Sequence, residues 1–122
     1  MEKSLRDRYQ KMNWQQQLGN MASTLARVSN NATVSEHDEI VVRCLREAAC
    51  FIEWSAPNAP SEHLLELAAM QRELLAWQRA WPIEAARPLL ALYARGQSDR
   101  ILKMAGFYDF AYKSPVTTQK AA

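Results

Sequence analysis

The two histidines of the sequence, His37 and His63, each follow a serine and a glutamate, so the tripeptide Ser-Glu-His occurs twice. Imidazole nitrogens bind transition metals, and a site built from both histidines is the first chemistry to consider. Each tripeptide, however, opens a predicted helix of about 20 residues, and the proline-containing linker should fold the two helices into an antiparallel hairpin. Their starts then lie about 30 Å apart. We therefore interpret Ser35 and Ser61 as N-caps and both histidines as first-turn residues rather than ligands.

Acidic residues gather at the predicted helix starts, where a nucleotide hydrolase would use such groups to hold Mg²⁺. In the first turn they also complement the positive end of the helix dipole, which requires no ligand. The sequence has no glycine-rich phosphate loop and no nucleophile–base motif in a recognisable context. A phosphorelay histidine needs an exposed mid-helix position, which neither histidine has. We expect a non-enzymatic protein with no metal and no cofactor. The acidic residues are Glu36, Asp38, Glu39, Glu62 and Glu66.

Length and composition are typical of one globular domain. The chain has 122 residues, of which 48% are hydrophobic, and its net charge of +2 gives no bulk electrostatic case for a nucleic-acid or membrane partner. No apolar segment typical of a secretory signal occurs at the start, and no apolar run is long enough to span a bilayer. Cys44 and Cys50 lie on different sides of a predicted helix and are expected to be reduced thiols. These features predict a cytoplasmic location.

Apolar residues recur at intervals of three and four along three segments, which predicts amphipathic helices over residues 4–29, 36–54 and 62–81. A fourth helix reaches residue 95 and is expected to end at Gly96, with a short capped helix and the Gly106 turn after it. We predict an all-α fold, a four-helix up-and-down bundle whose fourth helix is broken near Gly96. The apolar stripes are Trp14, Leu18, Met21, Leu25 and Val28; Val41, Leu45, Ala48 and Ile52; and Leu67, Met70, Leu74, Trp77 and Trp81.

Residues 1–113 are predicted to form this single domain, and residues 114–122 a flexible, disordered tail. The aromatic segment 107–112 is expected to fold back across the open end of the bundle; left exposed, it would instead anchor a protein interface. Trp54, at the end of the second helix, is expected to be partly exposed. The candidate partner-binding residues are Trp54, Phe107, Tyr108, Phe110 and Tyr112.

Residues 89–107 resemble the front of a bacterial helix-turn-helix of the response-regulator type, in which a glycine, a serine-capped helix and a glycine turn precede the recognition helix. The resemblance implies a DNA-binding regulator that uses a degenerate helix-turn-helix over residues 89–113. The recognition helix would be residues 108–113, which contain one basic residue and are followed by Pro115. Reading the major groove needs several side chains, so DNA binding is the alternative function.

Residues 13–23 (NWQQQLGNMAS) and 43–54 (RCLREAACFIEW) resemble small uncharacterised helical-bundle proteins of cyanobacteria. This resemblance implies a cytoplasmic adaptor or signalling bundle and supplies no site residues. From the patterning and the lack of catalytic motifs, we expect a non-enzymatic bundle that acts by binding another protein in a signalling or regulatory pathway. A homodimer would be one way to bury its exposed aromatic surface.

Overall fold

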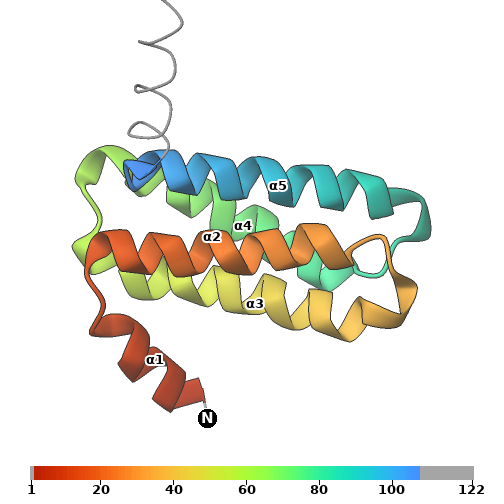
Figure 1. Ribbon diagram of the computed structural model, residues 1–122, viewed down its shortest axis with the longest axis horizontal. Helices are drawn as coiled ribbons and strands as arrows, with labels where there is room; N and C mark the ends of the chain where they lie inside the picture. The colour runs from red at the N-terminus through yellow and green to blue at the C-terminus, as the bar shows by residue number, and fades with distance from the viewer. Residues whose placement is uncertain (1, 108–122) are drawn as a thin grey trace, which may run out of the picture.

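The structure is a computed structural model that describes residues 2–107 (Figure 1). These residues form helices and turns with no β-strand, which confirms the all-α class. The predicted tail, residues 114–122, lies outside the described residues. Single 3₁₀ turns cover Ser35–His37, Ala56–Asn58, Ser61–His63 and Glu84–Ala86. The α-helices are α1 (Glu2–Gln10), α2 (Trp14–Asn31), α3 (Asp38–Ser55), α4 (Leu64–Ala80) and α5 (Arg87–Met104).

The four longer helices lie side by side along the long axis of the molecule (Figure 1). α2 contacts both α5 and α3, and α3 in turn packs against α4. The short helix α1 packs against α3 and diverges from the other helices toward its N-terminus (Figure 1). Among the described residues, no helix has both the length and the apolar character needed to cross a membrane.

The core consists largely of the predicted apolar stripes. On α2 and α3 every stripe residue is buried except Trp14, which is partly buried at the start of α2. Burial of a leucine-sized side chain stabilises a protein by about 1.5–3 kcal/mol, so these stripes fix which faces of the helices turn inward. The buried members are Leu18, Met21, Leu25 and Val28 on α2, Val41, Leu45, Ala48 and Ile52 on α3, and Leu67, Met70 and Leu74 on α4.

The first predicted helix is two helices, because the chain leaves the helical conformation between Gln10 and Trp14. Asn13 is the N-cap of α2, and its side-chain oxygen accepts a hydrogen bond from the backbone N–H of Gln16 at 2.8 Å. In return, the Asn13 N–H donates to the side-chain oxygen of Gln16 at 3.0 Å. This capping box satisfies two amides that a continuous helix would bond to carbonyls of the preceding turn. The prediction of one helix over residues 4–29 is therefore wrong.

Each Ser-Glu-His tripeptide forms a 3₁₀ turn, so the α-helix that follows begins after the histidine. His37 and His63 are consequently the N-cap residues of α3 and α4, and neither makes a side-chain capping hydrogen bond. The prediction that Ser35 and Ser61 cap these helices is wrong. The backbone fulfils that role instead, because each histidine N–H donates to the carbonyl three residues earlier, at 2.9 and 3.0 Å.

The predicted break at Gly96 is also wrong, because α5 continues through this residue to Met104. Glycine inside a helix costs about 1 kcal/mol relative to alanine. Packing against α2 outweighs that cost: Ser29 Oγ donates to the Ala91 carbonyl at 2.7 Å, and Ser98 Oγ donates to the Ala22 carbonyl at 2.9 Å. Gly106, with a φ of 88°, follows the end of α5 as predicted.

Candidate functional site

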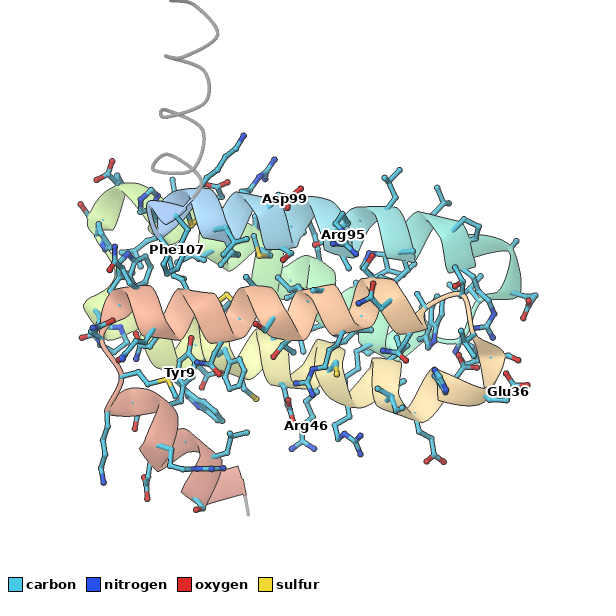
Figure 2. All side chains as sticks on the ribbon, in the orientation of Figure 1. Tyr9, Glu36, Arg46, Arg95, Asp99 and Phe107 are labelled. Carbon is cyan, nitrogen blue, oxygen red and sulfur yellow. The ribbon has the colours of Figure 1, made fainter. Side chains whose placement is uncertain are left out.

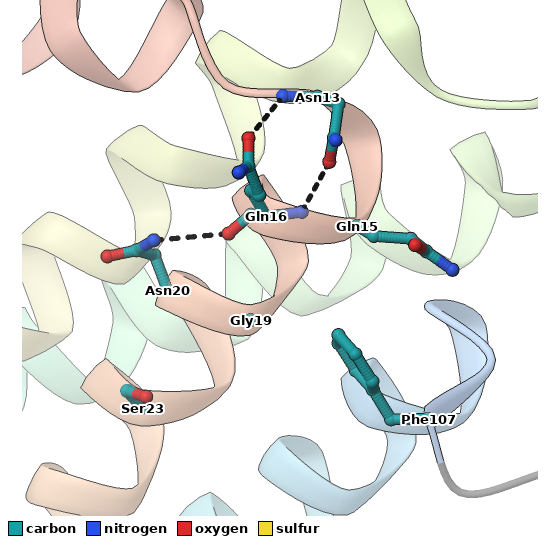
Figure 3. A pocket seen from close by; sticks show the side chains of 7 residues that line it. All are labelled: Asn13, Gln15, Gln16, Gly19, Asn20, Ser23 and Phe107. Atoms are coloured by element: carbon teal, nitrogen blue, oxygen red, sulfur yellow. Dashed lines mark hydrogen bonds between the residues drawn. The ribbon is translucent and has the colours of Figure 1, made fainter. Parts of the chain in front are cut away.

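The structure describes two of the five predicted partner-binding residues, Trp54 and Phe107. Trp54 is 7% exposed, and its ring packs beside Tyr9 and Phe51, with centroid distances of 6.0 and 5.8 Å. The expectation that Trp54 is partly exposed is therefore wrong. Phe107 is 46% exposed and extends toward Gly19 on α2 (Figure 3). Three other candidates lie outside the described residues: Tyr108, Phe110 and Tyr112.

Tyr9 is the residue that attaches α1 to the bundle and covers Trp54. It is 1% exposed, and its ring stacks on Phe51 with a centroid distance of 4.3 Å and an interplanar angle of 2°. Its hydroxyl donates to the Gln17 carbonyl at 2.9 Å. Burial raises the pKa of Tyr9 well above its usual value, so the hydroxyl remains a donor at all ordinary pH values. The C-terminal end of α1 is thereby fixed.

A groove of about 390 Å³ lies between α1 and α3, beside this anchor. Most of its surface is apolar, and arginines from both helices border it. α1 diverges from the bundle toward its N-terminus (Figure 1), and the groove is open to solvent. The lining residues are Leu5 and Arg8 from α1, and Arg43, Arg46, Glu47, Cys50 and Trp54 from α3.

The charge of this groove is positive. Three arginines face a single acidic residue, Glu47, whose carboxylate also lies 3.7 Å from the guanidinium of Arg27. Arg43 and Arg46 additionally border a second hollow, of about 440 Å³, which extends along α3 to Pro82 and is also lined by Asp38 and Glu39. Figure 2 shows Arg46 projecting from α3 on the side of the molecule away from α5. The two hollows therefore share these arginines. The positive charge is confined to the groove between α1 and α3, where arginines border apolar surface.

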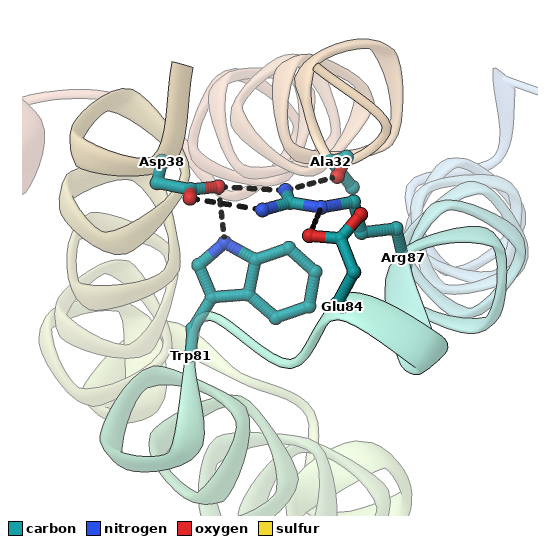
Figure 4. A network of polar contacts seen from close by, with 5 residues as sticks. All are labelled: Ala32, Asp38, Trp81, Glu84 and Arg87. Atoms are coloured by element: carbon teal, nitrogen blue, oxygen red, sulfur yellow. Dashed lines mark hydrogen bonds and ion pairs between the residues drawn. The ribbon is translucent and has the colours of Figure 1, made fainter. Parts of the chain in front are cut away.

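A polar network joins the helix ends at the opposite end of α3 (Figure 4). Arg87 is 7% exposed, and its two terminal nitrogens donate to the two carboxylate oxygens of Asp38 at 2.7 and 3.0 Å. The same guanidinium donates to the Ala32 carbonyl at 3.1 Å and to Glu84 at 3.0 Å. The indole N–H of Trp81 donates to Asp38 at 3.0 Å. The network thus connects α2, α3, α4 and α5.

This network is suited to holding helix ends rather than to transferring protons. Hydrogen bonding from Arg87 lowers the pKa of Asp38, and the Trp81 N–H lowers it further against the opposing effect of burial. Asp38 and Glu84 raise the pKa of Arg87 by hydrogen bonding, so the guanidinium stays charged. Both partners are ionised throughout the physiological range. The sequence analysis treats Asp38 as an acidic residue at a helix start and Trp81 as part of an apolar stripe. It predicts neither the ion pair of Asp38 with Arg87 nor the hydrogen bond from Trp81 to Asp38.

A third hollow, of about 300 Å³, lies where Phe107 faces the first turns of α2 (Figure 3). Its walls are mainly neutral amides, and several of these are engaged within the protein. Gln15 donates to the Ala105 carbonyl at 2.9 Å, and Asn20 donates to the Gln16 carbonyl at 3.1 Å. The first bond ties the end of α5 to the start of α2, and the second lies within α2, so both amides are engaged in holding the fold.

The thiols and imidazoles are dispersed. Cys44 is buried, which raises the pKa of its thiol, and Cys50 borders the groove between α1 and α3. The His63 ring stacks on Trp14 at 6.4 Å, whereas the partly buried His37 lies at the start of α3. Within residues 2–107, no group of three His, Cys, Asp or Glu side chains is placed to hold a metal ion.

Comparisons with protein-family models, curated proteins and solved structures found no match for this chain. The resemblance to cyanobacterial helical-bundle proteins therefore remains a prediction.

Proposed function

We propose that this protein is a cytoplasmic four-helix up-and-down bundle, carrying α1 as an additional arm, that works without catalysis by binding another protein. The observation that supports this proposal is the arginine-bordered groove between α1 and α3. It is lined by both apolar and cationic side chains, and α1 packs against α3 beside it.

The chemistry of the groove favours one kind of partner, an acidic amphipathic helix. Leu5 and Cys50 offer partly buried apolar surface along the floor, while Arg8 and Arg43 border it from the two helices. A helix that lays its apolar face in a groove is a common mode of recognition, with anchors one turn apart. Acidic residues flanking those anchors would meet the arginines and would speed association at low salt.

The proposal is tested with a fluorescently labelled, leucine- and glutamate-rich helical peptide, whose binding is followed by fluorescence anisotropy. We expect binding that weakens as salt is raised, and an Arg43→Glu variant that binds about tenfold more weakly. The matched control is Arg72→Glu, which reverses an exposed arginine on α4 and changes the net charge equally. Equal losses in the two variants would reduce the effect to bulk charge and overturn the assignment of the groove.

The alternative, DNA binding, is tested in the same assay with a labelled duplex. It relied on a helix end at Gly96, and α5 passes through that position without a turn. The proposed recognition helix, residues 108–113, lies outside the described residues. Salt-sensitive duplex binding that disappears in an Arg100→Ala, Lys103→Ala variant would favour this alternative over a protein partner.

A further inference from the structure

The face of α3 that lines the groove between α1 and α3 continues toward the start of this helix. There it lines the second hollow, which Gln78 of α4 and Pro82 border on the other side. The α3 residues that line the two hollows recur at intervals of three and four, so they lie on one face of the helix. Arg43 and Arg46 line both hollows and join them. We name this surface the α3 trough, and the residues of α3 along it are Glu39, Val42, Arg43, Arg46, Cys50 and Trp54.

The α3 trough is long enough for a helix of several turns. Glu39 and Trp54, at its two ends, are separated by about 22 Å along the axis of α3. Different elements form its outer walls, because α1 contributes Leu5 and Arg8 near the end of α3 and α4 contributes Gln78 near its start. Most of the surface of both hollows is apolar, which suits the apolar face of a bound helix.

The charge of the α3 trough changes along its length. The half beside α1 is positive, because three arginines face one acidic residue there. In the other half, Asp38 and Glu39 add negative charge at the start of α3. The Asp38 carboxylate is held by Arg87, so Glu39 is the acid that faces a ligand. Glu39 and Arg43 are both exposed, and within residues 2–107 neither side chain makes an ion pair.

We propose that the partner is a helix that fills the whole α3 trough, with basic residues in one terminal turn over Glu39 and acidic residues in the turns beside the arginines. The inference rests on the proposed function, since it concerns the same groove, and it adds the length and the charge order of the partner. A helix that is acidic throughout would place a carboxylate against Glu39. Such a contact between like charges selects against that partner, whereas a basic terminal turn is attracted.

Two peptide isomers of equal composition and net charge test the charge order. Both are labelled, leucine-rich helices of about 16 residues that carry the same glutamates and lysines. The lysines lie in one terminal turn of the first isomer and in the central turns of the second. The terminal isomer reaches Glu39 with its lysines whichever way it lies along α3, whereas the central isomer places them beside Arg43. Fluorescence anisotropy with the full chain should show the terminal isomer binding at least about tenfold more tightly.

Charge changes in the protein assign this preference to Glu39. In Glu39→Lys the advantage of the terminal isomer should disappear, and in Gln78→Glu, which adds an acid at the same end of the trough, the advantage should increase. The matched control is Glu36→Lys. Glu36 is an exposed acid in the turn before α3 that lines neither hollow, and its reversal changes the net charge equally, so the advantage should remain. Circular dichroism verifies that all three variants remain helical.

The outcomes separate this inference from the proposed function. If both isomers bind equally well and both lose affinity in Arg43→Glu, the groove binds helices but the proposed charge order is wrong. An advantage of the terminal isomer that survives in Glu39→Lys, or that is lost equally in Glu36→Lys, overturns the inference as well. If neither isomer binds the wild-type chain, the proposed function is overturned together with it.

Discussion

The guanidinium of Arg87 lies over the indole ring of Trp81, 5.3 Å from its centroid, while both side chains donate to the same oxygen of Asp38. One carboxylate thus joins the start of α3, the residue after α4 and the start of α5. The arrangement suits arginine in particular, because two parallel donors meet two carboxylate oxygens and a flat cation stacks on a flat ring.

Replacement of Arg87 by lysine should therefore lower the melting temperature by several degrees. Lysine retains the positive charge but cannot donate to both oxygens of Asp38 or stack on Trp81 in the same way. The control is Arg79→Lys, at an exposed position on α4, which should melt like the wild type. Thermal unfolding followed by circular dichroism measures both variants. A wild-type melting temperature for Arg87→Lys would mean that charge alone holds these helix ends.

The same pair predicts how stability depends on pH. Arg87 lowers the pKa of Asp38 in the folded state, below the value of about 4 in the unfolded chain. The stabilisation is complete above the unfolded value and is lost as the pH falls through the lower folded value. In Asp38→Asn the free energy of unfolding, measured with urea, should fall less steeply below pH 4 than in the wild type. Parallel profiles for the two proteins would contradict this assignment.

Periodicity predicted the inward faces of α2, α3 and α4 because burial of apolar side chains dominates the energetics of these helices. Periodicity does not show where side-chain hydrogen bonds to the backbone, as in a capping box, begin a new helix. The break before α2 depends on the capping-box pair Asn13 and Gln16, and the apolar stripe of this helix begins only after it, at Trp14. At Gly96 local propensity favours a helix end, whereas packing against α2 keeps α5 continuous.

The contacts at the two ends of α3 join residues that are far apart in the sequence, so local sequence patterns do not predict them. Trp54 is buried because Tyr9, far earlier in the chain, stacks on its neighbour Phe51. Arg87 meets Asp38 across a long sequence separation. One signal for the latter was present: Arg87 continues the inward-facing positions of α5, namely Leu90, Ala94, Ser98 and Ile101. A charged residue on a buried stripe requires a partner of opposite sign.

Gly96→Ala should stabilise the protein. The position is in mid-helix with open space for a Cβ, so alanine gains about 0.5–1 kcal/mol by restricting the unfolded chain. Gly106→Ala is the contrasting variant, because its φ of 88° disfavours any residue with a Cβ, and it should destabilise by about 1 kcal/mol. Urea unfolding at low protein concentration measures both. Destabilisation by Gly96→Ala would indicate that α5 is interrupted there after all.

Trp54→Ala should destabilise the protein by about 3–5 kcal/mol, as truncation of a buried aromatic side chain does. At 7% exposure, with its ring against Tyr9 and Phe51, Trp54 supports the site at which α1 is anchored. Arg43→Ala, on the exposed surface of the same helix, should change the free energy of unfolding by less than about 0.5 kcal/mol. Urea unfolding separates the two variants before any binding is measured.

Loss of partner binding in Trp54→Ala alone would then reflect detachment of α1, whereas loss of binding in a fully stable Arg43→Ala would reflect the groove itself. If Trp54→Ala proved as stable as the wild type, α1 would not cover this ring in solution, and Trp54 would again be a candidate contact residue.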